Sequence, residues 1–127
     1  MSFLTSPSQK NGAVAEAFAE RYLKRQGLIL IEKNFSCKLG EIDLIMQENE
    51  TLVFIEVRHR VSAAYGNAVE TVTREKQNKI IKASTLFMMK HKLLEKKSVR
   101  FDVFALQGKL ASSPQINWVK QAFNIMG

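Results

Sequence analysis

The sequence predicts an α/β fold. Apolar residues recur every three to four positions over residues 11–26 and 73–91, which is the spacing of an amphipathic helix. Apolar and polar residues alternate over residues 40–58 and 98–106, as expected for strands. The chain of 127 residues is 46% hydrophobic and has the size of one compact domain, which we place at residues 11–127.

The first helix is predicted to begin at Asn11, its N-cap, and to end at Gln26, before Gly27. The polar residues 1–10 are expected to form a flexible arm. Glu16 lies at the border of the apolar stripe of this helix. Its carboxylate could reach inward, or it could be a solvated acid that the helix dipole stabilises.

A short strand is predicted over residues 28–35, with Asn34 and Phe35 marking its end. It leads into residues 40–58, GEIDLIMQENETLVFIEVR, which hold two alternating segments around a polar centre. Both segments carry acidic side chains within apolar runs. This pattern predicts a β-hairpin with acids near its core.

A two-residue turn at Asn49–Glu50 would place Asp43 opposite Glu56 and Glu41 opposite Arg58, all on one face. A three-residue turn would place Glu56 on the other face. Like charges that face each other are destabilising in a strand pair. Two converging carboxylates suit Mg²⁺, which takes one or two of them and fills its other positions with waters and phosphate oxygens. The alternative is a half-exposed hairpin with solvated acids and a Glu41–Arg58 ion pair.

Residues 59–72 keep neither period and are predicted to form a loop, in which His59, Arg60 and Tyr65 are candidate contacts to nucleic acid. This loop could also be a plain connection.

The second helix is predicted over residues 73–91, with Thr73 as its N-cap and Gln77 beginning its apolar face. Three basic side chains, Arg74, Lys76 and Lys79, occupy the first turns, where backbone N–H groups also favour anions. An ordinary charged outer face would explain the lysines equally well.

Residues 98–106 alternate as a strand with Arg100 and Asp102 tied on its polar side. The stretch INWVKQAF is expected to be a last strand or short helix that covers a sheet edge with Trp118.

The charge of the chain favours a nucleic-acid partner. Nineteen basic and twelve acidic residues give a net charge of +7, which attracts polyanions such as nucleic acid or an anionic membrane surface. The single cysteine excludes an intrachain disulfide framework. No apolar run approaches the ~18 residues that span a bilayer, and no apolar leader begins the chain, so we expect a cytoplasmic protein without membrane contact.

Three motifs together resemble a known family. GEIDLI (residues 40–45), VFIEVRHR (53–60) and TREKQ (73–77) look like those of the YraN-like bacterial family of predicted endonucleases. More broadly, they are similar to the PD-(D/E)xK nuclease core of restriction endonucleases and Holliday junction resolvases. The resemblance implies the α-β-β-β-α-β core of the restriction-endonuclease-like fold, with a mixed sheet flanked by helices.

The resemblance also implies site residues. Asp43, Glu56 and the carbonyl of Val57 would hold Mg²⁺ or Mn²⁺, Glu16 would assist, and Gln77 would approach the metal or the phosphate. Phosphate contacts would come from Arg60, Arg74, Lys76 and Lys79, with Tyr65 a further contact. By analogy with resolvases, the substrate would be DNA and the protein could be a homodimer.

Arg58 stands where the nuclease motif has lysine. A guanidinium stays protonated and cannot take a proton from water as a desolvated lysine can. Three hypotheses follow: an endonuclease, possibly for branched DNA, in which Arg58 supplies charge; a weakly active or inactive nucleic-acid-binding protein of nuclease descent; and a basic scaffold protein.

Overall fold

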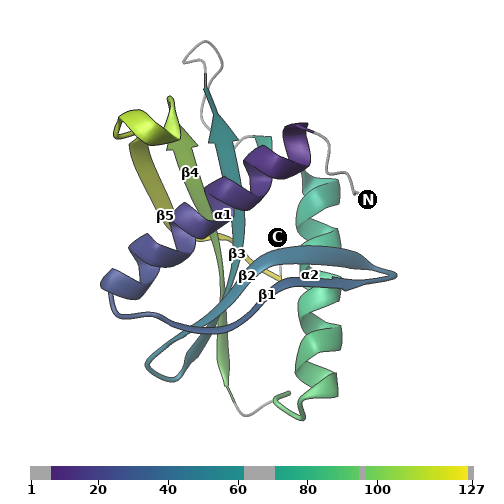
Figure 1. Ribbon diagram of the computed structural model, residues 1–127. Helices are drawn as coiled ribbons and strands as arrows, with labels where there is room; N and C mark the ends of the chain where they lie inside the picture. The colour runs from purple at the N-terminus through teal and green to yellow at the C-terminus, as the bar shows by residue number, and fades with distance from the viewer. Residues whose placement is uncertain (1–6, 62–70, 95–96, 126–127) are drawn as a thin grey trace.

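The computed structural model describes residues 7–61, 71–94 and 97–125. These described residues form two long helices and a five-stranded sheet, in the predicted order α-β-β-β-α-β followed by one more strand (Figure 1). The elements are α1 (Pro7–Arg25), β1 (Ile29–Cys37), β2 (Gly40–Glu48), β3 (Thr51–Arg60), α2 (Arg74–Lys90), β4 (Ser98–Gln107), the 3₁₀ helix η2 (Leu110–Ser112) and β5 (Gln115–Phe123).

The strands lie in the order β1-β2-β3-β4-β5, so every strand neighbours the next one in the sequence. All neighbours are antiparallel except β3 and β4, which run parallel. A parallel pair needs a crossover connection, and α2 lies within it. The sheet is therefore mixed, as the resemblance implied.

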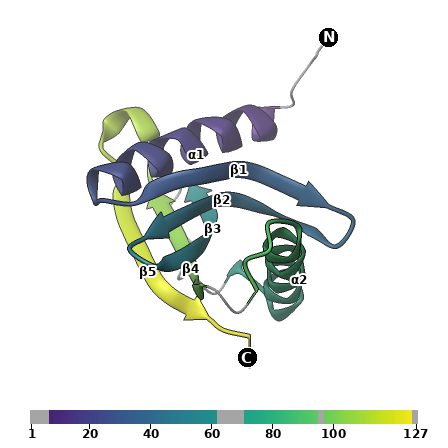
Figure 2. The same ribbon diagram turned by 90° about the horizontal axis from the view of Figure 1, so that it is seen from below.

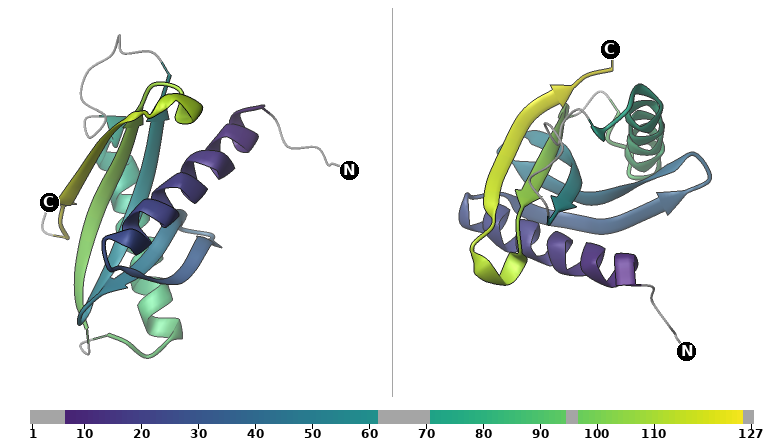
Figure 3. Two further views of the ribbon diagram at one scale, coloured as in Figure 1. Left: turned by 60° about the vertical axis from the view of Figure 1, so that its left-hand side comes forward. Right: turned by 90° about the horizontal axis from the view of Figure 1, so that it is seen from above.

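The two helices cover opposite faces of the sheet (Figures 2 and 3). On one face α1 packs Ala15, Ala19 and Leu23 against the sheet. On the other face α2 packs residues such as Ile80 and Phe87. The central strands are buried on both sides, which explains their long apolar runs. No helix in the described part of the chain is both long and apolar enough to cross a membrane.

Helix α1 begins at Pro7, four residues before the predicted start at Asn11. Proline is well tolerated at the first helical position, because its missing N–H has no partner there anyway. Residues 7–10 are therefore helical, while residues 1–6 of the predicted arm lie outside the described part. The C-terminus is as expected: Gly27 has φ of +100°, and the Leu28 N–H reaches the Leu23 carbonyl at 3.1 Å.

Helix α2 has the predicted ends. Thr73 is its N-cap, with Oγ1 accepting the Lys76 N–H at 3.1 Å, and His91 is its C-cap.

Two strands are longer than the sequence indicated. β1 does not end at Asn34 and Phe35 but continues to Cys37, because its pairing with β2 extends to the turn at Lys38 and Leu39. Asn34 has a left-handed backbone, with φ of 56°, which asparagine tolerates better than most residues. β3 continues through His59 and Arg60, which were predicted to begin a loop, because β4 pairs with it along that length.

The register of the central hairpin is the predicted one. β2 and β3 pair from Glu48–Thr51 to Leu44–Ile55 around a two-residue turn. Asn49 in that turn has φ of 54°, as hairpin turns of this length commonly require. The three-residue turn is excluded.

Asp102 on β4 was predicted to lie on a polar face of its strand, and this was wrong: Asp102 lies in the core. It is 0% exposed and forms two bonds with Arg100, at 2.9 and 3.1 Å. The indole of Trp118 and the backbone N–H of Gln121, both on β5, also donate to its carboxylate, at 2.9 and 3.0 Å. A register shift between β4 and β5 falls at this residue. The buried charge is compensated by these donors and holds the two strands together.

Candidate metal and nucleic-acid site

The site is formed where β2 separates from β3. The ladder between the two strands ends at Leu44 and Ile55. Beyond that pair, Oδ2 of Asp43 accepts the backbone N–H of Val57 at 2.8 Å. The hairpin of β1 and β2 turns away from β3 here (Figure 1). The aspartate side chain thus replaces a ladder hydrogen bond and lies at the opening between the strands.

Glu56, the predicted partner of Asp43, is buried and is 5% exposed. Burial raises the pKa of its carboxyl from the ordinary value of 4.5 to about 7, and the nearby Asp43 charge adds to the rise. Lys76 and Arg58 act in the opposite direction on the pKa of Glu56. Arg58 Nη2 lies 3.2 Å and Lys76 Nζ 3.8 Å from Oε2 of Glu56.

Glu16 reaches inward from α1, as one of the two interpretations predicted. Its neighbours in the sequence include the fully packed Ala15, which turns this side of the helix toward the sheet. The pKa of Glu16 is raised to about 7, chiefly by burial and secondly by the negative charge of Asp43. A side-chain hydrogen bond with Asn34 lowers the pKa of Glu16.

The three carboxylates share one pocket of about 350 Å³. Its lining residues come from α1, β2 and β3 and from the residue after β3: Gly12, Ala15, Glu16, Asp43, Glu56, Val57, His59 and Val61. Ionised carboxylates that share one pocket repel one another, and a cation between them would relieve that repulsion. The pocket is therefore acidic at its centre, within a chain of net positive charge.

The acidic pocket offers oxygen donors to a divalent ion. Within residues 7–61, 71–94 and 97–125, no three His, Cys, Asp or Glu side chains are already arranged to hold a metal ion. Mg²⁺ does not need three, because it binds through one or two carboxylates and keeps several waters. Asp43 and Glu56 with the Val57 carbonyl are hard oxygen donors of the kind that it prefers. The residues present fit such an ion.

A family comparison covers the charged residues of this site. Residues 15–106 match the model of the family described as "Uncharacterised protein family UPF0102", a range that contains Glu16, Asp43, Glu56, Arg58 and Lys76. The chain belongs to this family. A UPF0102 protein of Legionella pneumophila (strain Corby) is 46% identical over 117 residues, 92% of this chain and 97% of the relative. One of Pseudomonas syringae pv. syringae is 44% identical over 119 residues, 94% and 97% of the two chains. The expected YraN-like family membership is thus confirmed.

In this UPF0102 chain, Arg58 lies beside Glu56 and is not paired with Glu41. Glu41 is exposed, and the ladder that would have placed the two residues opposite each other ends earlier. Arg58 Nη2 instead forms the ion pair with Glu56. Its Nε is buried and has no hydrogen-bond partner among the described residues. The guanidinium therefore keeps one N–H donor without an acceptor, and it contacts the site through Glu56, because Arg58 is not among the residues that line the acidic pocket.

Lys76 is closer to the carboxylates than the sequence indicated. It was predicted as a phosphate contact on the first turns of α2, yet it is half-buried and reaches Glu56. Gln77 was predicted to approach the metal, but its amide Nε2 donates to the Val72 carbonyl at 3.0 Å. The described lining of the acidic pocket does not include Gln77. The lysine, one residue earlier, is the polar group of α2 that contacts the acids.

The other predicted contacts lie around the pocket. Arg74 and Lys79 are exposed on the first turns of α2. Arg60 ends β3, where its carbonyl accepts the Gly108 N–H at 2.8 Å. Tyr65 lies outside the described residues.

Asn34 had no predicted role in the site, and His59 was predicted only as a candidate contact to nucleic acid. Asn34 binds Glu16, and its left-handed backbone lies in β1, across from the irregular position of Asp43. His59 lines the acidic pocket, and its Nε2 forms a 2.7 Å hydrogen bond with the Gly108 carbonyl. An asparagine inside an otherwise strand-like stretch was the available signal for the first of these, because asparagine is depleted in strands.

Proposed function

We propose that this protein is a metal-dependent endonuclease that hydrolyses phosphodiester bonds in nucleic acid, with DNA, including branched DNA, as its substrate. The observation that supports this most strongly is the gathering of Glu16, Asp43 and Glu56 in one pocket, with two cationic side chains directly beside Glu56. A protein gains no stability from such an arrangement of like charges. A site for a cation and a phosphate accounts for it.

In this proposal Asp43, Glu56 and the Val57 carbonyl hold Mg²⁺ or Mn²⁺, and Glu16 assists directly or through a water. When bound, the ion supplies a water of lowered pKa and stabilises negative charge at the phosphate. Asn34 holds Glu16 through its side chain, and the Val57 N–H holds Asp43. These contacts orient the carboxylates before any ion enters.

Arg58 has the role of a fixed positive charge that orients the phosphate and stabilises the transition state. It cannot act as the base, because its guanidinium does not lose a proton. Arg60, Arg74, Lys76 and Lys79 contact phosphates around the cut, with Lys76 also neutralising part of the Glu56 charge. Because these are phosphate contacts, affinity for nucleic acid is expected to fall steeply as salt rises.

A second candidate is a nucleic-acid-binding protein of nuclease descent that cleaves slowly or not at all. The ion pairs of Arg58 and Lys76 with Glu56 favour it, because they occupy the oxygen that a metal would use. We also propose a homodimer, by analogy with resolvases, and a cytoplasmic location, from the composition of the chain.

The test is a panel of linear, flapped and four-way DNA and RNA substrates incubated with Mn²⁺ or Mg²⁺ and analysed on denaturing gels. The endonuclease should cleave at least one of them with metal and none with EDTA, and Asp43→Ala should abolish this cleavage. Binding without cleavage by the wild type would favour the second candidate. If the wild type neither binds nor cleaves nucleic acid, the basic scaffold protein is the remaining hypothesis.

A further inference from the structure

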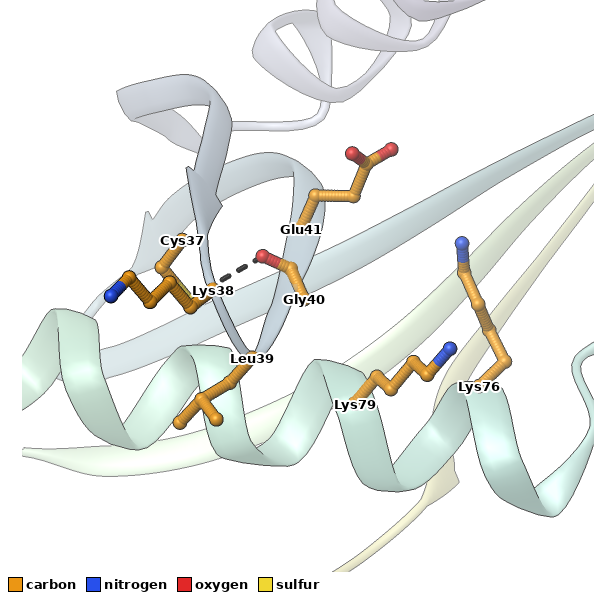
Figure 4. Close-up of a pocket in the computed structure, with 7 residues that line it drawn as sticks. All are labelled: Cys37, Lys38, Leu39, Gly40, Glu41, Lys76 and Lys79. Carbon is orange, nitrogen blue, oxygen red and sulfur yellow. Dashed lines mark hydrogen bonds between the residues drawn. The ribbon is translucent and has the colours of Figure 1, made fainter.

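A second pocket, of about 300 Å³, lies between the tip of the β1–β2 hairpin and the start of α2. Figure 4 shows its lining residues: Cys37, Lys38, Leu39, Gly40, Glu41, Lys76 and Lys79. It is about ten times the ~30 Å³ that one water occupies in the liquid. It thus has room for a hydrated phosphate group.

Three lysines and one glutamate give this pocket a positive charge. Lys38 and Lys79 are exposed, and within the described residues neither forms an ion pair. Lys24 and Lys33, in contrast, are both bound to Glu20. In Figure 4 the ammonium groups of Lys76 and Lys79 lie on the side of the hairpin that carries Glu41, and Lys38 extends from the turn away from them. As a flexible exposed side chain, Lys38 can turn toward an anion that binds there.

The hairpin tip is packed directly on α2, so the walls of the pocket are fixed relative to each other. A Cβ atom added to Gly40 would lie 2.7 Å from the carbonyl oxygen of Lys79. Real side chains do not tolerate this distance to a backbone atom. Gly40 therefore allows the close approach of the turn to the helix, and with it the spacing of Lys38 and Lys79.

The basic pocket adjoins the acidic one. Lys76 lines the basic pocket and also lies 3.8 Å from the buried Glu56, while Glu41 is two residues from Asp43. A nucleic-acid strand with one phosphate at the carboxylates would continue toward the hairpin tip. We propose that the pocket between the β1–β2 turn and α2 binds a backbone phosphate of the nucleic acid next to the cleaved bond, through Lys38 and Lys79. This inference rests on the proposed function.

The test measures binding and not cleavage. A fluorescein-labelled short DNA duplex is titrated with wild type, with the double variant Lys38→Ala/Lys79→Ala, and with Lys90→Ala, which removes an exposed lysine at the far end of α2. Anisotropy is recorded with EDTA over a range of salt concentrations. The double variant should bind roughly tenfold more weakly and lose about 1 to 2 from the slope of log affinity against log salt. Lys90→Ala should match the wild type, and equal affinities of the two variants would overturn the inference.

A further variant, Gly40→Ala, keeps every lysine and moves the hairpin tip away from α2. It should weaken binding in the same direction as the lysine variant, while unchanged binding would mean that the lysines act only as solvated charges, against the proposed pocket. Should this variant fail to fold by circular dichroism, the lysine variants decide alone. Inorganic phosphate at constant ionic strength should not displace the duplex; displacement would mark a site for free phosphate and contradict a backbone site.

The binding titration and the cleavage assay can fail independently of each other. If the lysine variant loses affinity while the wild type cleaves no substrate, the phosphate pocket is supported and the endonuclease proposal is contradicted. Metal-dependent cleavage with unchanged affinity of the lysine variant would remove the phosphate pocket alone.

Discussion

The carboxylate of Asp43 accepts the backbone N–H of Val57 at 2.8 Å, at the point where β2 and β3 cease to pair. The Asp43 side chain thereby provides a hydrogen-bond acceptor for the backbone of β3 where the two strands separate. Glu16 approaches this opening from α1. The bond also fixes Asp43 beside Val57, whose carbonyl is a proposed metal ligand. The effect of removing the charge of Asp43 follows from this geometry.

Asp43→Asn should keep an oxygen for the Val57 N–H and remove the negative charge. The pKa values of Glu16 and Glu56 should both fall below about 7, because Asp43 contributes to raising each of them. Carboxyl chemical shifts followed by NMR during a pH titration measure this. Asp43→Ala, the control, also loses the acceptor of the Val57 N–H, so its free energy of unfolding should be about 1 kcal/mol lower than that of Asp43→Asn. Unchanged pKa values in both variants would mean that the three acids are not in contact.

The metal-free protein should become less stable as pH rises from about 4.5 to 7. Glu56 takes up its proton near pH 7 in the folded chain and near 4.5 when unfolded, so in this window the folded state binds more protons. The free energy of unfolding should fall by about 2–3 kcal/mol across it on account of Glu56. Glu56→Gln is the matched control: its urea-unfolding curves should show a flatter pH profile. A wild type that gains stability over this window relative to Glu56→Gln contradicts the raised pKa.

The Arg58 series separates the two nucleic-acid hypotheses. If Arg58 acts by charge and geometry, Arg58→Ala should remove nearly all cleavage, and Arg58→Lys should be weaker than wild type because lysine lacks the planar fork. If the protein is a nuclease that has lost its base, Arg58→Lys should exceed the wild type. Initial cleavage rates at equal metal concentration decide between these outcomes.

Asp102 gives a prediction for stability away from the site. Asp102→Ala should cost about 3–5 kcal/mol, because Arg100 and the Trp118 indole would be left without their buried acceptor. Trp118→Phe, which loses one donor and keeps an aromatic ring, should cost about 1 kcal/mol. Chemical denaturation measures both changes. Equal, small losses would show that the Asp102 network contributes little.

Most of the fold could be predicted from the sequence because its signals are local. The alternation of residues 40–58 and the Asn49–Glu50 turn determine the hairpin register, and Thr73 and His91 mark the ends of α2. The residues at which β1 and β3 end could not be predicted in this way. Asparagine is depleted in strands, and the residues after Arg58 keep no alternation. Asn34 and His59 nevertheless lie in the sheet, because their strands pair with β2 and β4.

The site was predicted less completely than the fold. The register predicted Asp43 and Glu56 on one face, whereas the helix stripe allowed Glu16 to point inward or to be solvated. The family resemblance placed Glu16 with the other two, and the structure brings all three together. Lys76 could not, because its contact with Glu56 depends on how α2 lies across the sheet. Helical spacing alone favoured Gln77, whose amide is used by Val72. The burial of Asp102 likewise depends on the later packing of β5.

Isothermal titration with Mn²⁺ at pH 8, above the pKa of about 7 of both Glu16 and Glu56, shows whether the acidic pocket binds a divalent ion. The wild type should bind Mn²⁺ at a site that is lost in Asp43→Ala and in Glu56→Ala, while Asp102→Asn, which alters a carboxylate away from the pocket, should retain it. If the wild type binds no Mn²⁺, or if binding is unchanged when Asp43 and Glu56 are replaced, the acidic pocket is not a divalent-ion site.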